Sequence, residues 1–238
     1  MALDPRDTRG QLRLFVGVRV SVACANQLGS AAEALARRAQ QTGVRARWVA
    51  PASYHVTLAF LGWARRDAIE AVADAIARAT INEAPFGFRA ARLGAFPDLE
   101  KATVVWAGVE DSGALARIAG ALGRELAALG FPADPRPFHP HVTLGRLAQP
   151  AAVSGVVLPL AEQVFSDTRV NAVTLYESEM KPGGSEYRSV TEIPLFGPEN
   201  AAKRQTSPVQ PASLDAATGA SRAIETDDGW DRDPERRP

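Results

Sequence analysis

The sequence predicts an α/β (α+β) protein with two similar halves, each an antiparallel-rich sheet with outer helices, around a central cleft. Two observations lead to this prediction. The tetrapeptide His-Val-Thr-Leu occurs at residues 55–58 and again at 141–144, in a chain of 238 residues with only three histidines. The order strand, Ala-rich helix, loop and His-Val-Thr-Leu strand occurs over 12–61 and is repeated over 102–147. Two halves related by a pseudo-twofold axis would face each other across a cleft that the two His-Val-Thr-Leu strands line.

Hydrophobic periodicity places the individual elements, with glycine and proline as breaks between them. Strands are expected at 12–20, 44–49, 55–62, 86–96, 102–109 and 141–147, with a final hairpin of 170–180 and 186–196. Helices are expected at 21–42, 66–80 and 112–129, with Gly43 and Gly130 as stop signals and a Pro-rich loop at 130–140. The folded domain is predicted to span 1–196. Residues 197–238 are rich in Pro, Ala, Ser and charge, so they lack the apolar surface needed to offset ordering entropy and are expected to form a disordered tail.

Composition excludes several classes of protein. Lys+Arg and Asp+Glu both number 27, so no large net field attracts nucleic acid or membranes, and any nucleic-acid contact must come from a local basic patch. Cys24 is the only cysteine, which rules out a disulfide framework or a cysteine-based zinc cage. The sequence has no secretory signal and no apolar stretch long enough for a transmembrane helix, so a cytoplasmic monomer is expected.

The two His-Val-Thr-Leu strands are the candidate functional feature. Side chains alternate along a strand, so His and Thr share one face, about 7 Å apart, while Val and Leu share the other. Two copies would place His55, Thr57, His141 and Thr143 around one centre. Paired histidines suit general acid and general base chemistry near neutral pH. In-line displacement at phosphorus needs such a pair, and threonine hydroxyls can hold the non-bridging oxygens.

Three segments also carry a family resemblance: "RWVAPASYHVTLAFLG" (47–62), "RPFHPHVTLGRL" (136–147) and "ESEMKPGGSEYRSVTEIPL" (177–195). They resemble the RNA 2′,3′-cyclic phosphodiesterase family of the two-histidine (2H) phosphoesterase superfamily, whose bacterial members are also described as RNA 2′-5′ ligases. The resemblance implies a bilobal 2H phosphoesterase fold, no metal or cofactor, and hydrolysis of a terminal 2′,3′-cyclic phosphate to a 2′-phosphomonoester. It implies that His55 is the proton donor and His141 the proton acceptor. It also implies that Thr57 and Thr143 are phosphate ligands.

Other residues near the motifs are candidates for contact with RNA: Arg136, Phe138, His139, Arg146 and Tyr187. Strand alternation predicts that Arg146, five residues after His141, points away from the histidine face unless the strand has ended. Three alternative functions remain open. The same site could join RNA halves through a 2′-5′ bond, or it could bind nucleotides or RNA without turnover. His55, His139 and His141 could also hold zinc, although that leaves the duplicated threonines unexplained.

Overall fold

The computed structural model describes residues 10–181 and 184–197. Apart from Gly197, the expected tail lies outside these residues. The elements are β1 (Gln11–Arg19), α1 (Val22–Gln41), β2 (Ala46–Trp48), η1 (Pro51–Ser53), β3 (His55–Arg65), η2 (Arg66–Ala68), α2 (Ile69–Ala79), β4 (Phe86–Phe96), β5 (Ala102–Asp111), α3 (Ala114–Ala127), β6 (His141–Ala151), α4 (Ser154–Val157), η3 (Leu158–Leu160), β7 (Val164–Val170), β8 (Ala172–Lys181) and β9 (Gly184–Pro194).

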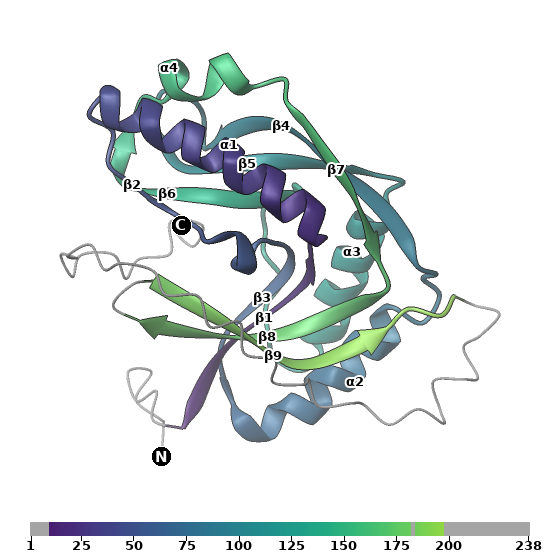
Figure 1. Ribbon diagram of the computed structural model, residues 1–238. Helices are drawn as coiled ribbons and strands as arrows, with labels where there is room; N and C mark the ends of the chain where they lie inside the picture. Colours follow the sequence, from purple (N-terminus) through teal and green to yellow (C-terminus); the bar gives the residue numbers. More distant parts are fainter. Residues whose placement is uncertain (1–9, 182–183, 198–238) are drawn as a thin grey trace.

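In the described part of the chain, the strands form one antiparallel sheet with the order β7-β4-β5-β6-β3-β1-β8-β9, and β2 pairs with β6 (Figure 1). The predicted fold class is therefore confirmed. The two His-Val-Thr-Leu strands, β3 and β6, are direct neighbours at the centre of this order. They are hydrogen-bonded through one residue pair, Val56 and Val142, so the two halves meet inside one sheet and are not separate sheets.

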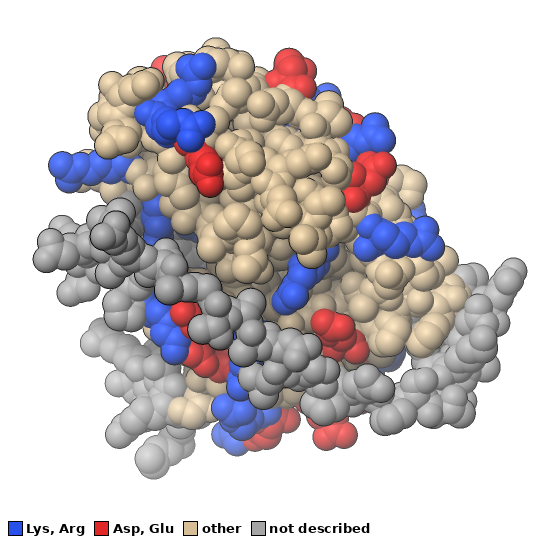
Figure 2. All heavy atoms as spheres, in the orientation of Figure 1, with Lys and Arg blue, Asp and Glu red and all other residues tan. Residues whose placement is uncertain are grey.

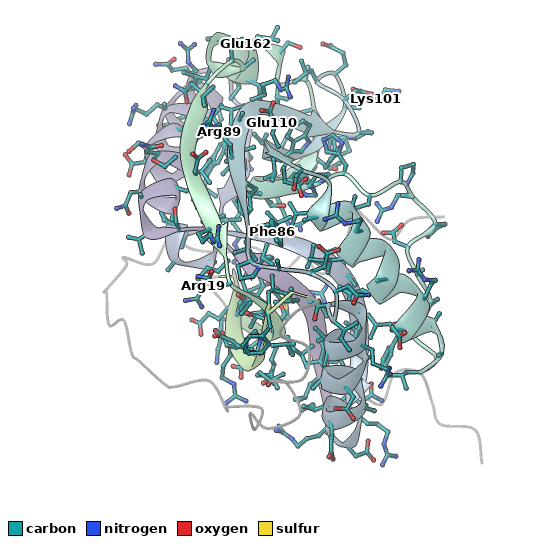
Figure 3. The ribbon with its side chains drawn as sticks, turned by 90° about the vertical axis from the view of Figure 1, so that its right-hand side faces the viewer. Arg19, Phe86, Arg89, Lys101, Glu110 and Glu162 are labelled. Atoms are coloured by element: carbon teal, nitrogen blue, oxygen red, sulfur yellow. The ribbon has the colours of Figure 1, made fainter. Side chains whose placement is uncertain are left out.

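Each half is covered by a helix that the chain order assigns to the other half. Helix α1 connects β1 to β3, yet it packs on β6 and β7 of the second half (Figures 1 and 3). Ser21 caps α1 by accepting from the Cys24 N–H, and its own hydroxyl donates to the Asp167 carbonyl of β7 at 3.1 Å. Helix α3 connects β5 to β6, yet it packs on β3 and on α2. The helices are thus exchanged between the halves.

The sequence predicts no helix or strand for residues 148–169, but the structure has three elements there. The short helix α4, the turn η3 and the strand β7 all lie there. The first two are only one turn long, and Pro159 interrupts the apolar pattern. Strand β7 lies at the edge of the sheet, and its sequence VFSDTRV contains several polar residues, as exposed edge strands often do. Its apolar signal is therefore weak.

The surface agrees with the balanced charge of the sequence. On the face drawn in Figure 2, basic and acidic side chains are mixed in small groups and form no broad basic surface. Among the described residues, no helix is both long enough and apolar enough to cross a membrane.

Candidate active site

The two motif strands place equivalent side chains on equivalent faces. Val56 and Val142 are fully buried at the centre, and the following leucines, Leu58 and Leu144, are also buried in the core. The histidines and threonines of both motifs are half-buried on the opposite face. Because β3 and β6 run antiparallel through Val56 and Val142, His55 lies on the Thr143 side and Thr57 on the His141 side.

A β-bulge interrupts both motif strands at the same position. Leu58 is an extra residue in β3 relative to β1, and Leu144 is an extra residue in β6 relative to β5. A bulge shifts the alternation by one residue, so the residue five positions after each histidine returns to the histidine face. These residues are Phe60 and Arg146. The prediction that Arg146 points away from the site is therefore wrong, because the strand does not alternate regularly.

The two histidines are held by the same hydrogen bond. His55 Nδ1 lies 2.7 Å from the carbonyl oxygen of Ser53, and His141 Nδ1 lies 2.7 Å from the carbonyl oxygen of His139. A carbonyl oxygen can only accept, so each Nδ1 carries the proton and donates it. In the neutral ring, Nε2 is then left with its lone pair, which is the form that a general base requires.

The aromatic surroundings differ between the two halves. The His55 ring lies 4.8 Å from the ring of Phe15 and meets Tyr187 edge-on at 5.0 Å. The His141 ring meets Phe96 edge-on at 5.0 Å, and His139 packs against both Phe96 and Trp106, which also contact each other. Each catalytic candidate is therefore fixed in orientation by packing as well as by its backbone bond.

Burial lowers the pKa of both histidines to about 4. In each ring the largest cause is desolvation of the charged form, which the backbone hydrogen bond partly offsets. The positive charges of His141, Arg146 and Arg19 lower the pKa of His55 further, and those of His139 and Arg146 do the same for His141. An anion placed between the rings would favour their protonated forms and raise both pKa values again.

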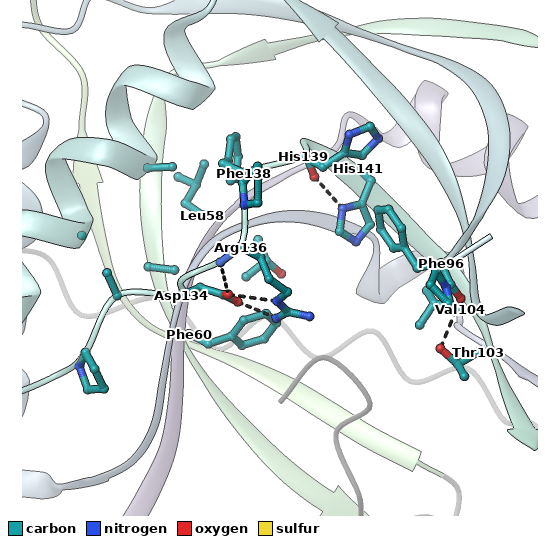
Figure 4. Close-up of a pocket in the computed structure, with 18 of the residues that line it drawn as sticks. Leu58, Phe60, Phe96, Thr103, Val104, Asp134, Arg136, Phe138, His139 and His141 are labelled. Carbon is teal, nitrogen blue, oxygen red and sulfur yellow. Dashed lines mark hydrogen bonds and ion pairs between the residues drawn. The ribbon is translucent and has the colours of Figure 1, made fainter. Parts of the chain in front are cut away.

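A cavity of about 1580 Å³ opens beside the second motif (Figure 4). Thr57, His141 and Arg146 line it, together with Phe60 and Phe96. Its other walls are one face of α3 and the loop from Phe131 to His139. Typical small-molecule pockets measure roughly 300–1,000 Å³, so this cavity has room for more than one nucleotide.

The remaining predicted RNA contacts lie at this cavity or beside His55. Arg136, Phe138 and His139 line the cavity, and Tyr187 contacts His55. Arg136 donates from Nε to Asp134 Oδ1 at 2.9 Å, so part of its charge is already paired (Figure 4). The ring of Phe138 also packs against the hydrophobic core.

Three site residues were missed from the sequence. Trp106 lies opposite Thr143 and contacts His139. Lys101, in the segment between β4 and β5, lines the cavity. Gly17 lies opposite Thr57, and a Cβ there would come within 2.7 Å of the Val56 carbonyl oxygen. For Gly17, the one available signal in the sequence was a glycine in a strand of otherwise bulky apolar residues, which is typical of a place where two backbones approach closely.

The described residues contain no group of three His, Cys, Asp or Glu side chains placed to hold a metal ion. The zinc alternative built on His55, His139 and His141 therefore has no ligand cluster in this structure.

Comparisons with known proteins place the chain in a family. The model of the 2′-5′ RNA ligase superfamily matches residues 27–181, which include both motifs. A Geobacillus stearothermophilus protein named RNA 2′,3′-cyclic phosphodiesterase is 33% identical over 156 residues, which cover 63% of this chain and 48% of that protein. The chain thus spans about half the length of that relative. An Archaeoglobus fulgidus protein of the same name is 29% identical over 180 residues, covering 75% of this chain and 98% of that protein.

Solved structures agree with this assignment. A crystal structure of a Thermus thermophilus protein is similar with a TM-score of 0.64 and 26% identity, covering 78% of this chain and 99% of that one. Escherichia coli LigT, solved with 3′-AMP, shares the fold with a TM-score of 0.59 and 24% identity, covering 78% of this chain and 98% of LigT. The family inferred from the two motifs is confirmed: this chain belongs to the 2′-5′ RNA ligase superfamily of two-histidine phosphoesterases.

Proposed function

We propose that the chain hydrolyses terminal 2′,3′-cyclic phosphates of RNA to 2′-phosphomonoesters, with His55 and His141 as acid and base. One observation carries this proposal. The two histidines sit in adjacent, duplicated strands and are held in the same tautomer by the same bond, which supports a centre shared by their two Nε2 atoms. The shared name of the curated relatives supports the same substrate class.

The proposed step is an in-line displacement at phosphorus. A water molecule attacks the phosphorus atom and forms a new P–O bond, while His141 Nε2 takes a proton from that water. The bond from phosphorus to the ribose 3′ oxygen breaks as protonated His55 gives that oxygen a proton. The products are a 2′-phosphomonoester and a 3′-hydroxyl, and solvent exchange returns both rings to their starting protonation states.

Thr57 and Thr143 are proposed to hold the non-bridging oxygens by donating their hydroxyl protons. Arg146 is proposed to add a positive charge to the same oxygens, because the bulge at Leu144 turns it to the histidine face. The assignment of donor to His55 and acceptor to His141 follows the family pattern. It is also consistent with the cavity, which His141 lines and through which water can reach the phosphorus.

The test is product analysis on small substrates. The protein is incubated in EDTA with 2′,3′-cyclic AMP or with 3′,5′-cyclic AMP, and the products are separated by chromatography. We expect turnover of the 2′,3′-cyclic compound alone, with 2′-AMP as the product. Formation of 3′-AMP would contradict the proposed leaving group, and a lack of turnover would favour the non-catalytic binding module.

A second candidate is ligation through a 2′-5′ bond. The observation that favours it is the size of the cavity beside His141, which exceeds what an attacking water needs. A 5′-hydroxyl RNA end in that cavity could replace water as the nucleophile, with the same proton transfers. Incubating an oligonucleotide with a 2′,3′-cyclic phosphate end together with a 5′-hydroxyl oligonucleotide distinguishes the reactions. A joined product resistant to a 3′-5′-specific ribonuclease at the junction would support ligation.

A further inference from the structure

Trp63 is an exposed tryptophan near the end of the first motif strand. Its side chain is 52% exposed, in contrast to the buried apolar residues around it, Leu61 and Ala64. It lies opposite Arg13 of β1. A large aromatic ring beside an arginine on an open sheet is the combination that single-stranded RNA readers use to stack bases and pair phosphates.

The face that carries Trp63 is continuous with the candidate active site. Along β1, Leu12 and Leu14 point to the core, so Arg13 and Phe15 share the other face. Phe15 contacts the His55 ring on that face, and its cross-strand partner is Phe60. Trp63, opposite Arg13, therefore points to the same side as His55. At about 3.3 Å per residue, Trp63 lies roughly 15–20 Å along the strand from Thr57.

Acidic side chains of the neighbouring strand point away from this face. In β8, Tyr176 and Ser178 alternate with Glu177 and Glu179. Tyr176 stacks on Phe15 and so points to the histidine side. The two glutamates point to the opposite side, where Glu177 pairs with Arg188 at 2.8 Å and Glu179 with Lys181 at 2.8 Å. The histidine side of the sheet is thereby left free of these two negative charges.

The pattern continues across the hairpin. Tyr187 of β9 lies opposite Ser178 and meets both His55 and Phe15 edge-on, at 5.0 and 5.1 Å. Phe60, on the other side of Phe15, also lines the cavity beside His141. An aromatic surface thus runs from the histidines to Trp63 with no change of face.

We propose that this aromatic face, defined by Trp63, Arg13, Phe60 and Tyr187, binds the nucleotides on the 5′ side of the terminal nucleotide of a single-stranded RNA. The inference rests on the proposed function, because the cyclic phosphate at the histidines fixes where the 3′ end lies. A base stacks on Trp63, and a phosphate of the same strand meets Arg13. Substrates several nucleotides long are then preferred over a mononucleotide.

The test compares two substrates, 2′,3′-cyclic AMP and a six-nucleotide oligoadenylate with a 2′,3′-cyclic phosphate end. Trp63→Ala is expected to raise KM for the oligonucleotide about tenfold or more, since base stacking on one aromatic side chain is worth that much. It should leave both kinetic constants for cyclic AMP unchanged. Trp63→Phe should restore most of the affinity for the oligonucleotide, and Trp63→Leu should not.

Two further measurements sharpen the test. Arg13→Gln should reduce the slope of log affinity for the oligonucleotide against log salt concentration by about 0.7, the value for one phosphate contact on a single strand. In a His141→Ala background, the oligonucleotide should quench tryptophan fluorescence more than 2′,3′-cyclic AMP does, and this additional quench should be lost when Trp63→Phe is added. Leu158→Ala, at a 57% exposed residue of η3 in the other half, is the matched control and should change nothing.

The outcomes separate this inference from the proposed function. If cyclic AMP is turned over and Trp63→Ala affects both substrates equally, or neither, the aromatic face is not an RNA site. If cyclic AMP is not turned over, the proposed function fails, and the fluorescence titration alone decides whether the face binds RNA. A face made for a protein partner would give no quench beyond that produced by 2′,3′-cyclic AMP.

Discussion

Phe60 and Arg146 occupy equivalent positions in the two halves of the molecule. Each follows its motif histidine by five residues, and a bulge at the motif leucine turns each to the histidine face. The duplicated strands therefore carry the same residues at the histidine and threonine positions. They differ three residues after the threonine, where one strand has Phe60 and the other Arg146. One half presents an apolar ring where the other presents a permanent positive charge, so the two halves would contact an asymmetric anionic substrate differently.

Replacing Arg146 by Gln should raise the pKa of both His55 and His141, because the charge of Arg146 lowers both. It should also weaken binding of a phosphate anion. With only three histidines in the chain, their ring protons can be followed individually by NMR titration. Arg146→Lys should keep the low pKa values. Arg89→Gln removes an exposed arginine paired with Asp167 and should move neither histidine. Unchanged histidine titrations in Arg146→Gln would place this charge away from the site.

His55→Gln and His141→Gln should each lower kcat for 2′,3′-cyclic AMP by about 10²–10⁴-fold, the usual contribution of a general acid or base. His139→Gln is the matched control. Its kcat should fall far less, because His141 is held by the main-chain carbonyl of His139 and the substitution leaves that carbonyl in place. Near-full activity in either motif variant would contradict the paired mechanism.

Anion binding should be coupled to proton uptake. Both histidines are neutral in the free protein above about pH 4, and a bound dianion favours their charged forms. Sulfate is the suitable probe, since it does not titrate in this range. Calorimetry at pH 6 in buffers of different ionisation enthalpy should show net uptake of protons on sulfate binding. Uptake should fall in His55→Gln and in His141→Gln. Equal heats in all buffers would contradict the coupling.

The free energy of unfolding should decrease as the pH falls from about 7 to about 4. The folded pKa of each motif histidine is about 4 and the ordinary value is 6.5, so the unfolded chain binds more protons between these values. Stability is therefore full above the ordinary value and is lost as protons bind to the unfolded state. Urea titrations across this range check the trend. In the double variant His55→Gln/His141→Gln, the free energy of unfolding should change less with pH over this range. The part of the pH dependence that comes from carboxylates should remain.

Gly17→Ala should destabilise the protein by about 1–3 kcal/mol, as overpacking does, and should also lower activity. A Cβ at Gly17 would lie 2.7 Å from the carbonyl oxygen of Val56, between His55 and Thr57, so β1 or β3 must shift at the motif. Gly87→Ala is the matched control in another strand, where the nearest atom to a new Cβ lies at 3.7 Å. Equal stability of the two variants in chemical denaturation would show that the motif can adapt.

Sequence patterns were sufficient wherever local periodicity decides the structure. The alternation in His-Val-Thr-Leu predicted that Val56 and Val142 are buried while His55 and His141 lie on the other face, and both hold. The same rule failed at Arg146, because a bulge depends on pairing with a neighbouring strand and leaves no local mark. Trp63 was overlooked for a related reason, since its face is defined only by its partner Arg13.

The exchange of helices could not be predicted from sequence either. Helix α1 has an ordinary amphipathic pattern, and that pattern is the same whichever sheet it covers. Its contacts with β6 and β7 are set by residues far away in the chain. Periodicity therefore identified the elements and the repeat, and long-range packing determined how the halves interlock.

The exchanged helices also limit how the molecule can move. Residues 20–21 join β1 to α1, and residues 112–113 join β5 to α3, so each short connection links a strand of one half to a helix packed on the other. Rotating one half against the other would strain both connections at once. Hinge opening is thus opposed by two short connections, although β3 and β6 are hydrogen-bonded only through the pair of Val56 and Val142. The two motif strands are thereby held side by side as soon as the chain folds, so a substrate would meet the proposed acid and base already in place and would not need to draw them together.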